Sequence, residues 1–299
     1  MPFVVGPTAV GKTSMAVELA QHLPVTVISA DSRQVYRRLD IGTAKPTPEE
    51  LRTVPHLGID VVDPGETYSA GRFAADANEW LRSIPSGRLA MVVGGTGFYV
   101  RALADGLFQE PPMDQHARTR LREWAKSYEG LSRWAARLDP NFTGGGRQRA
   151  ARAVEVALLT GRPLSWWQHQ ANIESPITPF YVRLTAPRSV LHQRIETRVD
   201  SMLEAGLVAE VDGILDSGIS PNAPGLDAVG YREVVACLKG VMQLDELASR
   251  ITISTRRYAK RQETWFRHQL RSSEVLNLDV TDGSRTNAER FLKRWEKRI

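Results

Sequence analysis

The chain has 299 residues, 42% apolar and 24% charged, a balance typical of globular proteins that excludes a globally disordered chain. Its formal charge of +5 and isoelectric point of about 9.5 favour a polyanionic partner such as nucleic acid. The single cysteine, Cys237, excludes an internal disulfide and a zinc site of several cysteines. No apolar run reaches about 18 residues and the first strand leaves no room for a signal peptide, so we expect a cytoplasmic protein without a membrane partner.

Short apolar runs alternate with helical patterns through the first third of the chain, which is typical of a parallel sheet with helices on both faces. Strands are predicted at 3–5, 25–30, 57–62 and 89–95, and helices at 12–22 and 70–83. From residue 108 the strand pattern stops, and helical segments rich in Arg, Trp and Ala follow. A strand returns at 180–187, and helices are predicted from there to the C-terminus, with Ser189 as a candidate cap.

Residues 6–13 have the glycine, lysine and threonine spacing of a phosphate-binding loop, between an expected strand and an expected helix. Glycines let the backbone wrap around an anion, and the helix N-terminus adds partial positive charge. Lys12 supplies a cation, and the Thr13 hydroxyl is placed to bind Mg²⁺. The residues predicted to hold a phosphate or diphosphate are Gly6, Pro7, Thr8, Ala9, Val10, Gly11, Lys12 and Thr13.

The predicted fold is therefore α/β, a P-loop NTPase-like parallel sheet flanked by helices with an inserted all-helical subdomain. We expect residues 1–107 and 178–299 to form the catalytic core with C-terminal RNA-binding helices, and residues 108–177 to form the insert.

The loop alone does not identify the reaction. The strand at 89–95 ends in glycines and Thr96, where a nucleotide hydrolase usually carries a metal-binding aspartate, which disfavours an ATPase or GTPase. Asp31 follows another strand, so we expect it at the same edge of the sheet, within reach of whatever attacks the bound substrate. Asp31 or Ser32 could instead cap a helix.

Six segments also resemble a known family: "GPTAVGKT", "ADSRQVYRRLDIGTAKP", "VVGGTGFYVRAL", "RIETRVDSMLEAGL", "VGYRE" and "TRRYAKRQETWFR". In order and spacing they are similar to tRNA dimethylallyltransferases, the bacterial tRNA isopentenyltransferases. The resemblance implies Mg²⁺-dependent transfer of a dimethylallyl group from dimethylallyl diphosphate to N6 of the adenosine just 3′ of the anticodon of tRNA. We expect a monomer.

The same resemblance implies roles for individual residues. Asp31 accepts the amine proton, and Lys12 and Arg198 hold the diphosphate, with Arg194 as the alternative arginine on the same helix face. Thr96 binds a phosphate oxygen or orients Asp31; it could also be an ordinary turn residue.

The target adenine must leave its stack to reach a buried carboxylate, and Gln34 is placed to read its edge. Predicted tRNA contacts are Asp31, Ser32, Arg33, Gln34, Thr96, Arg118, Gln148, Arg149, Ala150, Ala151, Arg152, Asp227, Gly230, Tyr231, Arg232, Lys260, Arg261 and Arg267. Without the resemblance, the basic residues read as solvated helix faces and residues 227–232 as a helix-start turn. The stretch "FTGGGRQRAAR" departs from the family pattern, which puts the contacts of that stretch in doubt.

Three rival functions remain open. A small-molecule or nucleoside kinase would use the same loop for ATP and Asp31 as its base, a noncatalytic RNA-binding protein would use nucleotide as a switch, and a related transferase would prenylate free AMP. The arginine-rich insert favours tRNA over AMP.

Overall fold

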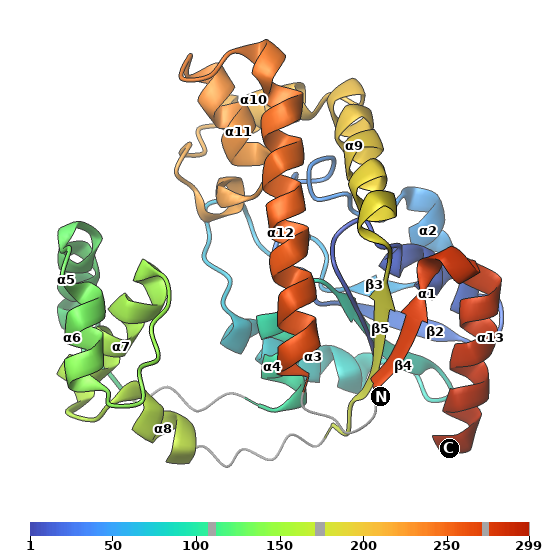
Figure 1. Cartoon of the computed structure of the whole chain (residues 1–299), viewed down its shortest axis with the longest axis horizontal. Helices are drawn as coiled ribbons and strands as arrows, with labels where there is room; N and C mark the ends of the chain where they lie inside the picture. The colour runs from blue at the N-terminus through green and yellow to red at the C-terminus, as the bar shows by residue number, and fades with distance from the viewer. Residues whose placement is uncertain (107–111, 171–176, 271–274, 299) are drawn as a thin grey trace. The chain divides into compact units, whose positions relative to one another are not determined.

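The computed structural model describes residues 1–106, 112–170, 177–270 and 275–298 (Figure 1). The chain divides into two compact units, one from Met1–Ala104 and Pro176–Ile299 and the other from Asp105–Ser175. The predicted boundary between residues 107 and 108 lies outside the described residues. No described helix is long and apolar enough to span a bilayer.

The first unit is built on a six-stranded sheet in the order β3-β2-β4-β1-β5-β6, with every named pair parallel (Figure 1). The central strands are β-branched and almost wholly buried, as expected of a sheet covered on both faces. The strands are β1 Pro2–Val5, β2 Val25–Ser29, β3 His56–Leu57, β4 Leu89–Gly94, β5 Phe180–Thr185 and β6 Val275–Asp279.

Helices flank this sheet, which confirms the predicted fold class. α9 packs along α12, α1 packs against α13, and α3 packs against α4 (Figure 1). The helices of this unit are α1 Lys12–Ala20, α2 Pro48–Thr53, α3 Ala70–Ser83, α4 Gly97–Ala104, α9 Arg188–Glu204, α10 Leu207–Asp216, α11 Tyr231–Leu238, α12 Leu247–Gln269 and α13 Ser284–Trp295.

Three sequence-based predictions of elements are wrong. The strand predicted at 57–62 stops at Leu57, because Gly58 (φ 84°) and Asp60 (φ 57°) turn the backbone out of the extended region. The C-terminal segment is not all helical, since β6 pairs with β5 at the edge of the sheet. Ser189 does not cap α9, which begins at Arg188 without a side-chain cap.

The described part of the second unit is helical, with α5 Gln115–Ser127, α6 Leu131–Leu138, α7 Arg147–Thr160 and α8 Leu164–Gln170. Small and apolar side chains from α5, α6 and α7, including Ala125, Leu131 and Ala150, form its core. In the unusual glycine stretch, Arg147 donates to the carbonyl oxygens of Ala125, Lys126 and Tyr128 and so caps the end of α5.

Candidate active site

The phosphate-binding loop connects β1 to α1 at the carboxyl edge of the sheet. Ala9 (φ 62°) and Gly11 (φ 98°) adopt left-handed conformations that curl the backbone. A Cβ at Gly6 would lie 2.8 Å from the Leu184 carbonyl oxygen, so only glycine fits there. No side chain caps α1, which leaves the N–H groups of its first turn available to an anion.

Lys12 points back over this loop. Its Nζ donates to the carbonyl oxygens of Gly6 (3.1 Å) and Pro7 (2.9 Å). Loss of hydration in the cavity lowers the pKa of Lys12 to about 8; the Asp31 carboxylate opposes this lowering, and the Arg198 charge adds to it. The ammonium group is therefore held where an anion would stabilise it.

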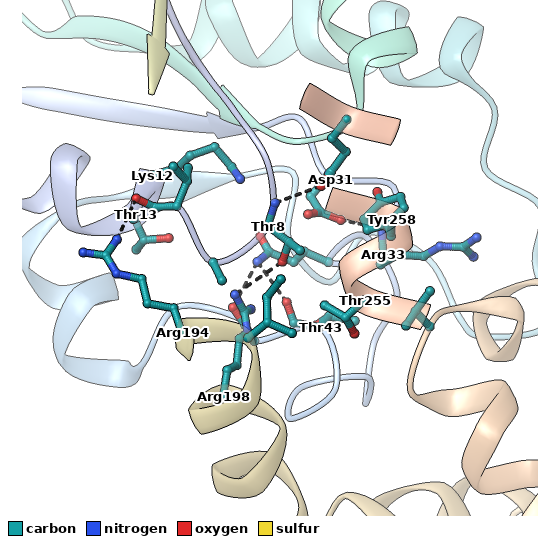
Figure 2. Close-up of a pocket in the computed structure, with 18 of the residues that line it drawn as sticks. Thr8, Lys12, Thr13, Asp31, Arg33, Thr43, Arg194, Arg198, Thr255 and Tyr258 are labelled. Carbon is teal, nitrogen blue, oxygen red and sulfur yellow. Dashed lines mark hydrogen bonds between the residues drawn. The ribbon is translucent and has the colours of Figure 1, made fainter. Parts of the chain in front are cut away.

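The two candidate arginines on α9 have different positions. The Arg194 guanidinium donates to the Val10 carbonyl oxygen at 3.2 Å, on the Thr13 side of the loop, and the Arg198 guanidinium lies 3.5 Å from the Thr8 hydroxyl (Figure 2). Loss of hydration lowers the pKa of Arg198, and only the Asp31 carboxylate opposes it. Arg198 therefore lies beside Thr8 and within electrostatic reach of Asp31, whereas Arg194 supports the loop at Val10.

Asp31 follows β2 on the opposite side of the pocket, beside Arg33 and Tyr258 (Figure 2). No helix follows it, so it does not cap one. Its Oδ1 accepts the Arg33 N–H at 2.8 Å, and among the described residues no ion pair engages the carboxylate. Burial and the nearby Asp31 charge raise the pKa of the Tyr258 hydroxyl to about 12.

Thr96 supports the residue next to Asp31 rather than Asp31 itself. Its Oγ1 accepts the Ser32 N–H at 2.9 Å and lies 3.2 Å from the Ser32 hydroxyl. A side chain is excluded at neighbouring Gly94, where a Cβ would lie 2.1 Å from the Ala30 carbonyl oxygen. The strand end therefore has no room for the aspartate that a nucleotide hydrolase places there.

The phosphate-binding loop, the two arginines of α9 and Asp31 line one cavity of about 980 Å³ within the first unit. Lys12, Thr13, Arg194 and Arg198 bring positive charge and a hydroxyl, while Asp31 brings one carboxylate. Apolar side chains from α9 and α12, including Val199 and Ile251, line other parts of the wall. The cavity thus combines a site for a multiply charged anion, a free carboxylate and apolar surface.

A polar network holds the segment that follows Asp31. The two amide hydrogens of Gln34 go to the carbonyl oxygens of Thr43 (3.4 Å) and Ala44 (3.1 Å), so in this conformation they are not presented to a base edge as predicted. Glu210 accepts the N–H groups of Asp40 and Ile41 at 2.9 and 2.8 Å.

Two of the predicted tRNA contacts are wrong, because their side chains are buried. Tyr231 is 0% exposed, and its hydroxyl donates to Glu210 at 2.6 Å, so the side chain holds the loop near Gly42 instead of facing RNA. Ala150 is also 0% exposed and belongs to the core of the second unit. Gly230 offers only backbone, but neighbouring Asp227 and Arg232 are exposed and line the cavity.

In the second unit, Arg118, Arg122 and Arg152 converge on the buried carboxylate of Glu155. Arg118 and Arg122 lie at 2.9 and 2.7 Å from it, and Arg152 also pairs with it. Burial alone would raise the pKa of Glu155, but the arginines together outweigh burial and lower it. Gln148 and Arg149 on α7 are exposed, and Ala151 is half-buried.

The outer face of α12 carries a stripe of basic residues that includes the predicted tRNA contacts Lys260, Arg261 and Arg267. Arg257, Lys260, Arg261 and Arg267 are exposed, whereas Arg256 pairs with Glu196 of α9 at 2.5 Å. The Arg261 guanidinium lies 5.7 Å from the Tyr258 ring centroid, and Arg261 also lines the cavity. The inner face of the same helix contacts the site through Gln262, whose Oε1 accepts the Thr8 N–H at 2.8 Å.

Sequence reasoning missed Gln262, Glu210 and Glu155 because each acts through a partner that is remote in sequence. Each is a polar residue on an otherwise amphipathic helix, a position that the helical period assigns to the buried face. A buried polar residue needs a hydrogen-bond partner. A polar residue at a position predicted to be buried was therefore the signal in the sequence that could have identified these three residues.

Comparison with known proteins is consistent with this geometry. A family model described as IPP transferase matches residues 34–269. The chain is 44% identical over 276 residues to the tRNA dimethylallyltransferase of Syntrophobacter fumaroxidans, covering 88% of this chain and 80% of that protein. It is 46% identical over 279 residues to tRNA dimethylallyltransferase 1 of Syntrophotalea carbinolica, covering 89% and 88%.

Solved structures agree. The tRNA isopentenylpyrophosphate transferase of Bacillus halodurans superposes with a TM-score of 0.73 at 36% identity, over 99% of this chain and 96% of that chain. A eukaryotic dimethylallyltransferase acting on tRNA superposes with a TM-score of 0.80 at 25% identity, over 98% and 77%. The chain belongs to the IPP transferase family, which confirms the resemblance carried by its motifs.

Proposed function

We propose that this chain is a tRNA dimethylallyltransferase, which transfers the dimethylallyl group of dimethylallyl diphosphate to N6 of the adenosine just 3′ of the anticodon and releases pyrophosphate. The observation that carries the proposal is one cavity with a phosphate-binding loop on one side and, on the other, the carboxylate of Asp31, which forms no ion pair with any residue that the structure describes. The names of the relatives support it. Because the proposed substrate is tRNA, we also propose that the protein acts in the cytoplasm.

The loop side of the cavity holds the leaving group. The N–H groups from Val10 to Thr13, with Lys12 and Arg198, surround the diphosphate and stabilise the negative charge that grows on it as the C1–O bond breaks. Both cations have a lowered pKa in the free protein, because loss of hydration destabilises their charged forms. A bound anion offsets this destabilisation. This matches a reaction whose main requirement is stabilisation of the departing charge.

The Asp31 side holds the acceptor. The exocyclic amine of adenine is a weak nucleophile, and it must lose a proton as nitrogen bonds to carbon. Asp31 accepts that proton, while the Arg33 N–H and the Thr96–Ser32 bonds hold the segment in place. The adenosine enters the cavity as a base flipped out of the anticodon loop.

The donor set beside the loop fits Mg²⁺. The Thr13 hydroxyl lies at the start of α1 in the cavity wall, beside the loop that would hold the diphosphate, and hydroxyl and phosphate oxygens are ligands that Mg²⁺ prefers. When bound there, Mg²⁺ neutralises part of the diphosphate charge.

Positively charged surfaces of both units bind the tRNA backbone, and phosphate contacts of this kind fix the position of the RNA. In the first unit the exposed face of α12 and the cavity mouth contribute, and in the second unit the start of α7 and the arginines around Glu155 contribute. The residues assigned to phosphate contacts are Arg33, Arg232, Lys260, Arg261 and Arg267, with Arg118, Arg149 and Arg152 of the second unit. Ser32, Asp227, Gln148 and Ala151 carry no positive charge and are assigned to other contacts with the tRNA. We expect the protein to act as a monomer.

The test is incubation of the purified chain with Mg²⁺, dimethylallyl diphosphate and unmodified tRNA, followed by nucleoside mass spectrometry. We expect one dimethylallyl group on the adenosine beside the anticodon, and none on free AMP supplied at the same concentration. Modification of AMP would indicate an adenylate-directed transferase. ATP consumption without dimethylallyl transfer would replace the proposal with a kinase.

A further inference from the structure

Gln262 joins two parts of the site that are far apart in sequence. The residue is 7% exposed; Oε1 accepts the Thr8 N–H at 2.8 Å, and Nε2 donates to the Gly95 carbonyl oxygen at 2.8 Å. Because one backbone group can only donate and the other can only accept, the orientation of the amide is fixed. In its ordinary charge state at neutral pH, no other side-chain type of this length offers one donor and one acceptor on a single planar group, because an ionised glutamate can only accept.

Each of these two hydrogen bonds connects Gln262 to one half of the proposed reaction centre. Thr8 belongs to the loop that holds the diphosphate. Gly95 precedes Thr96, whose Oγ1 accepts the Ser32 N–H at 2.9 Å, and Ser32 directly follows Asp31. Gln262 is thus the junction between the leaving-group side and the proton-accepting side.

We infer that Gln262 is a positioning residue that sets the alignment between the bound diphosphate and Asp31. The inference rests on the proposed function. Displacement at C1 requires the amine nitrogen, the carbon and the departing oxygen to be held within a narrow range of distance and angle. The amide of Gln262 holds the two walls at one separation before either substrate binds.

The glycine turn after β4 packs closely against the face of α12 that carries Gln262. A Cβ at Gly95 would lie 2.3 Å from Gln262 Nε2, and a Cβ at Gly97 would lie 2.3 Å from the Trp265 ring. Gln262 and Trp265 are three residues apart on α12 and therefore share a face. The glycine turn after β4 is shaped to this face, so the contact is specific rather than incidental.

Two substitutions distinguish the effect of the two amide hydrogen bonds from the effect of side-chain packing. Gln262→Met keeps the approximate volume and the helix propensity but removes both hydrogen bonds. Gln262→Glu, measured at a pH at which the new carboxyl group is ionised, keeps an acceptor for the Thr8 N–H but turns a carboxylate oxygen toward the Gly95 carbonyl oxygen. The matched control is Gln269→Met, at the exposed end of the same helix.

For both Gln262 variants we expect kcat to fall about 10- to 100-fold, because alignment acts in the chemical step. The KM for dimethylallyl diphosphate should rise about three- to tenfold, since the loop loses its anchor, while the Kd for tRNA stays within about twofold of wild type. Gln269→Met should match wild type in all three quantities. A kcat within about twofold of wild type in either folded Gln262 variant would overturn the inference.

A double-mutant cycle distinguishes positioning from general destabilisation. Thr96→Ala lies on the same chain of bonds, so its effect on kcat should be strongly non-additive with Gln262→Met, whereas fully additive effects contradict the inference. Circular dichroism checks folding, and Gln262→Glu carries the test if Gln262→Met does not fold. If the wild-type chain transfers no dimethylallyl group, the proposed function fails by itself. In that case calorimetry with inorganic pyrophosphate tests the role of Gln262 in the loop. Equal affinity of wild type and Gln262→Met for pyrophosphate would show that Gln262 does not anchor the loop.

Discussion

The charge of Lys12 is expected to control donor binding above neutral pH. Loss of hydration lowers the pKa of Lys12 to about 8 in the free protein. A bound diphosphate favours the charged ammonium group, so the pKa is higher in the complex. The affinity for dimethylallyl diphosphate is therefore fully present below about pH 8 and is lost as the pH rises through this value.

The size of the effect follows from the titration of one group. Each pH unit above the free-protein pKa reduces the affinity about tenfold, or ~1.4 kcal/mol, until the pKa of the complex is reached. Calorimetric titration of dimethylallyl diphosphate between about pH 7 and pH 9.5 measures this slope directly. At saturating donor, kcat should not show this loss, because Lys12 stays protonated in the complex.

Lys12→Arg provides the control, because a guanidinium group remains charged over the whole range. Its affinity for the donor is expected to be weaker than that of wild type but independent of pH. An affinity of the wild-type chain that is constant within about twofold over this range would refute the reasoning. An equal decrease in Lys12→Arg would do so as well, since it would assign the titration to another group.

Four further substitutions test other parts of the site. Asp31→Asn should lower kcat by about 10²- to 10⁴-fold with little change in the Kd for tRNA, measured by single-turnover kinetics and filter binding, and near-normal turnover would remove Asp31 as the base. Arg261→Ala should weaken tRNA binding and reduce the slope of log K against log salt by about one, and an unchanged slope would argue against a phosphate contact. Arg267, paired with Glu263 at 3.0 Å, should show a smaller change when replaced by Ala. Gly94→Ala should lower stability by about 3 kcal/mol or more, because its Cβ would overlap the Ala30 carbonyl oxygen, and a melting temperature equal to wild type would contradict the close approach.

The phosphate-binding side of the site was predictable because its determinants are local. The spacing from Gly6 to Thr13 directs several N–H groups and one lysine to the same point, whatever the rest of the chain does. The position of Asp31 also followed from sequence, since the ends of parallel strands share one edge of the sheet. The alternation of apolar strands and amphipathic helices was sufficient for the fold class.

The predictions of strands were wrong where backbone turns or tertiary pairing outweighed the local pattern of apolar residues. The apolar run after His56 reads as a strand, but backbone turns at Gly58 and Asp60 end the pairing after two residues. β6 is short and half exposed, so its sequence signal is weak, and only pairing with β5 makes it a strand.

The sequence by itself determined the phosphate-binding loop, the carboxylate at the neighbouring strand end, the class of fold and the family, because each depends on spacing along a short stretch. The tertiary structure alone decided which side chains reach the site and which are buried. Gln262 meets Thr8 across 254 residues of chain, Glu210 holds Ile41 across 169, and Tyr231 turns inward to Glu210. These pairs form only when the helices pack, and the local sequence of one helix does not show which residue of another it will contact. The hydrogen-bond partner of a buried polar group is therefore known only from the tertiary structure.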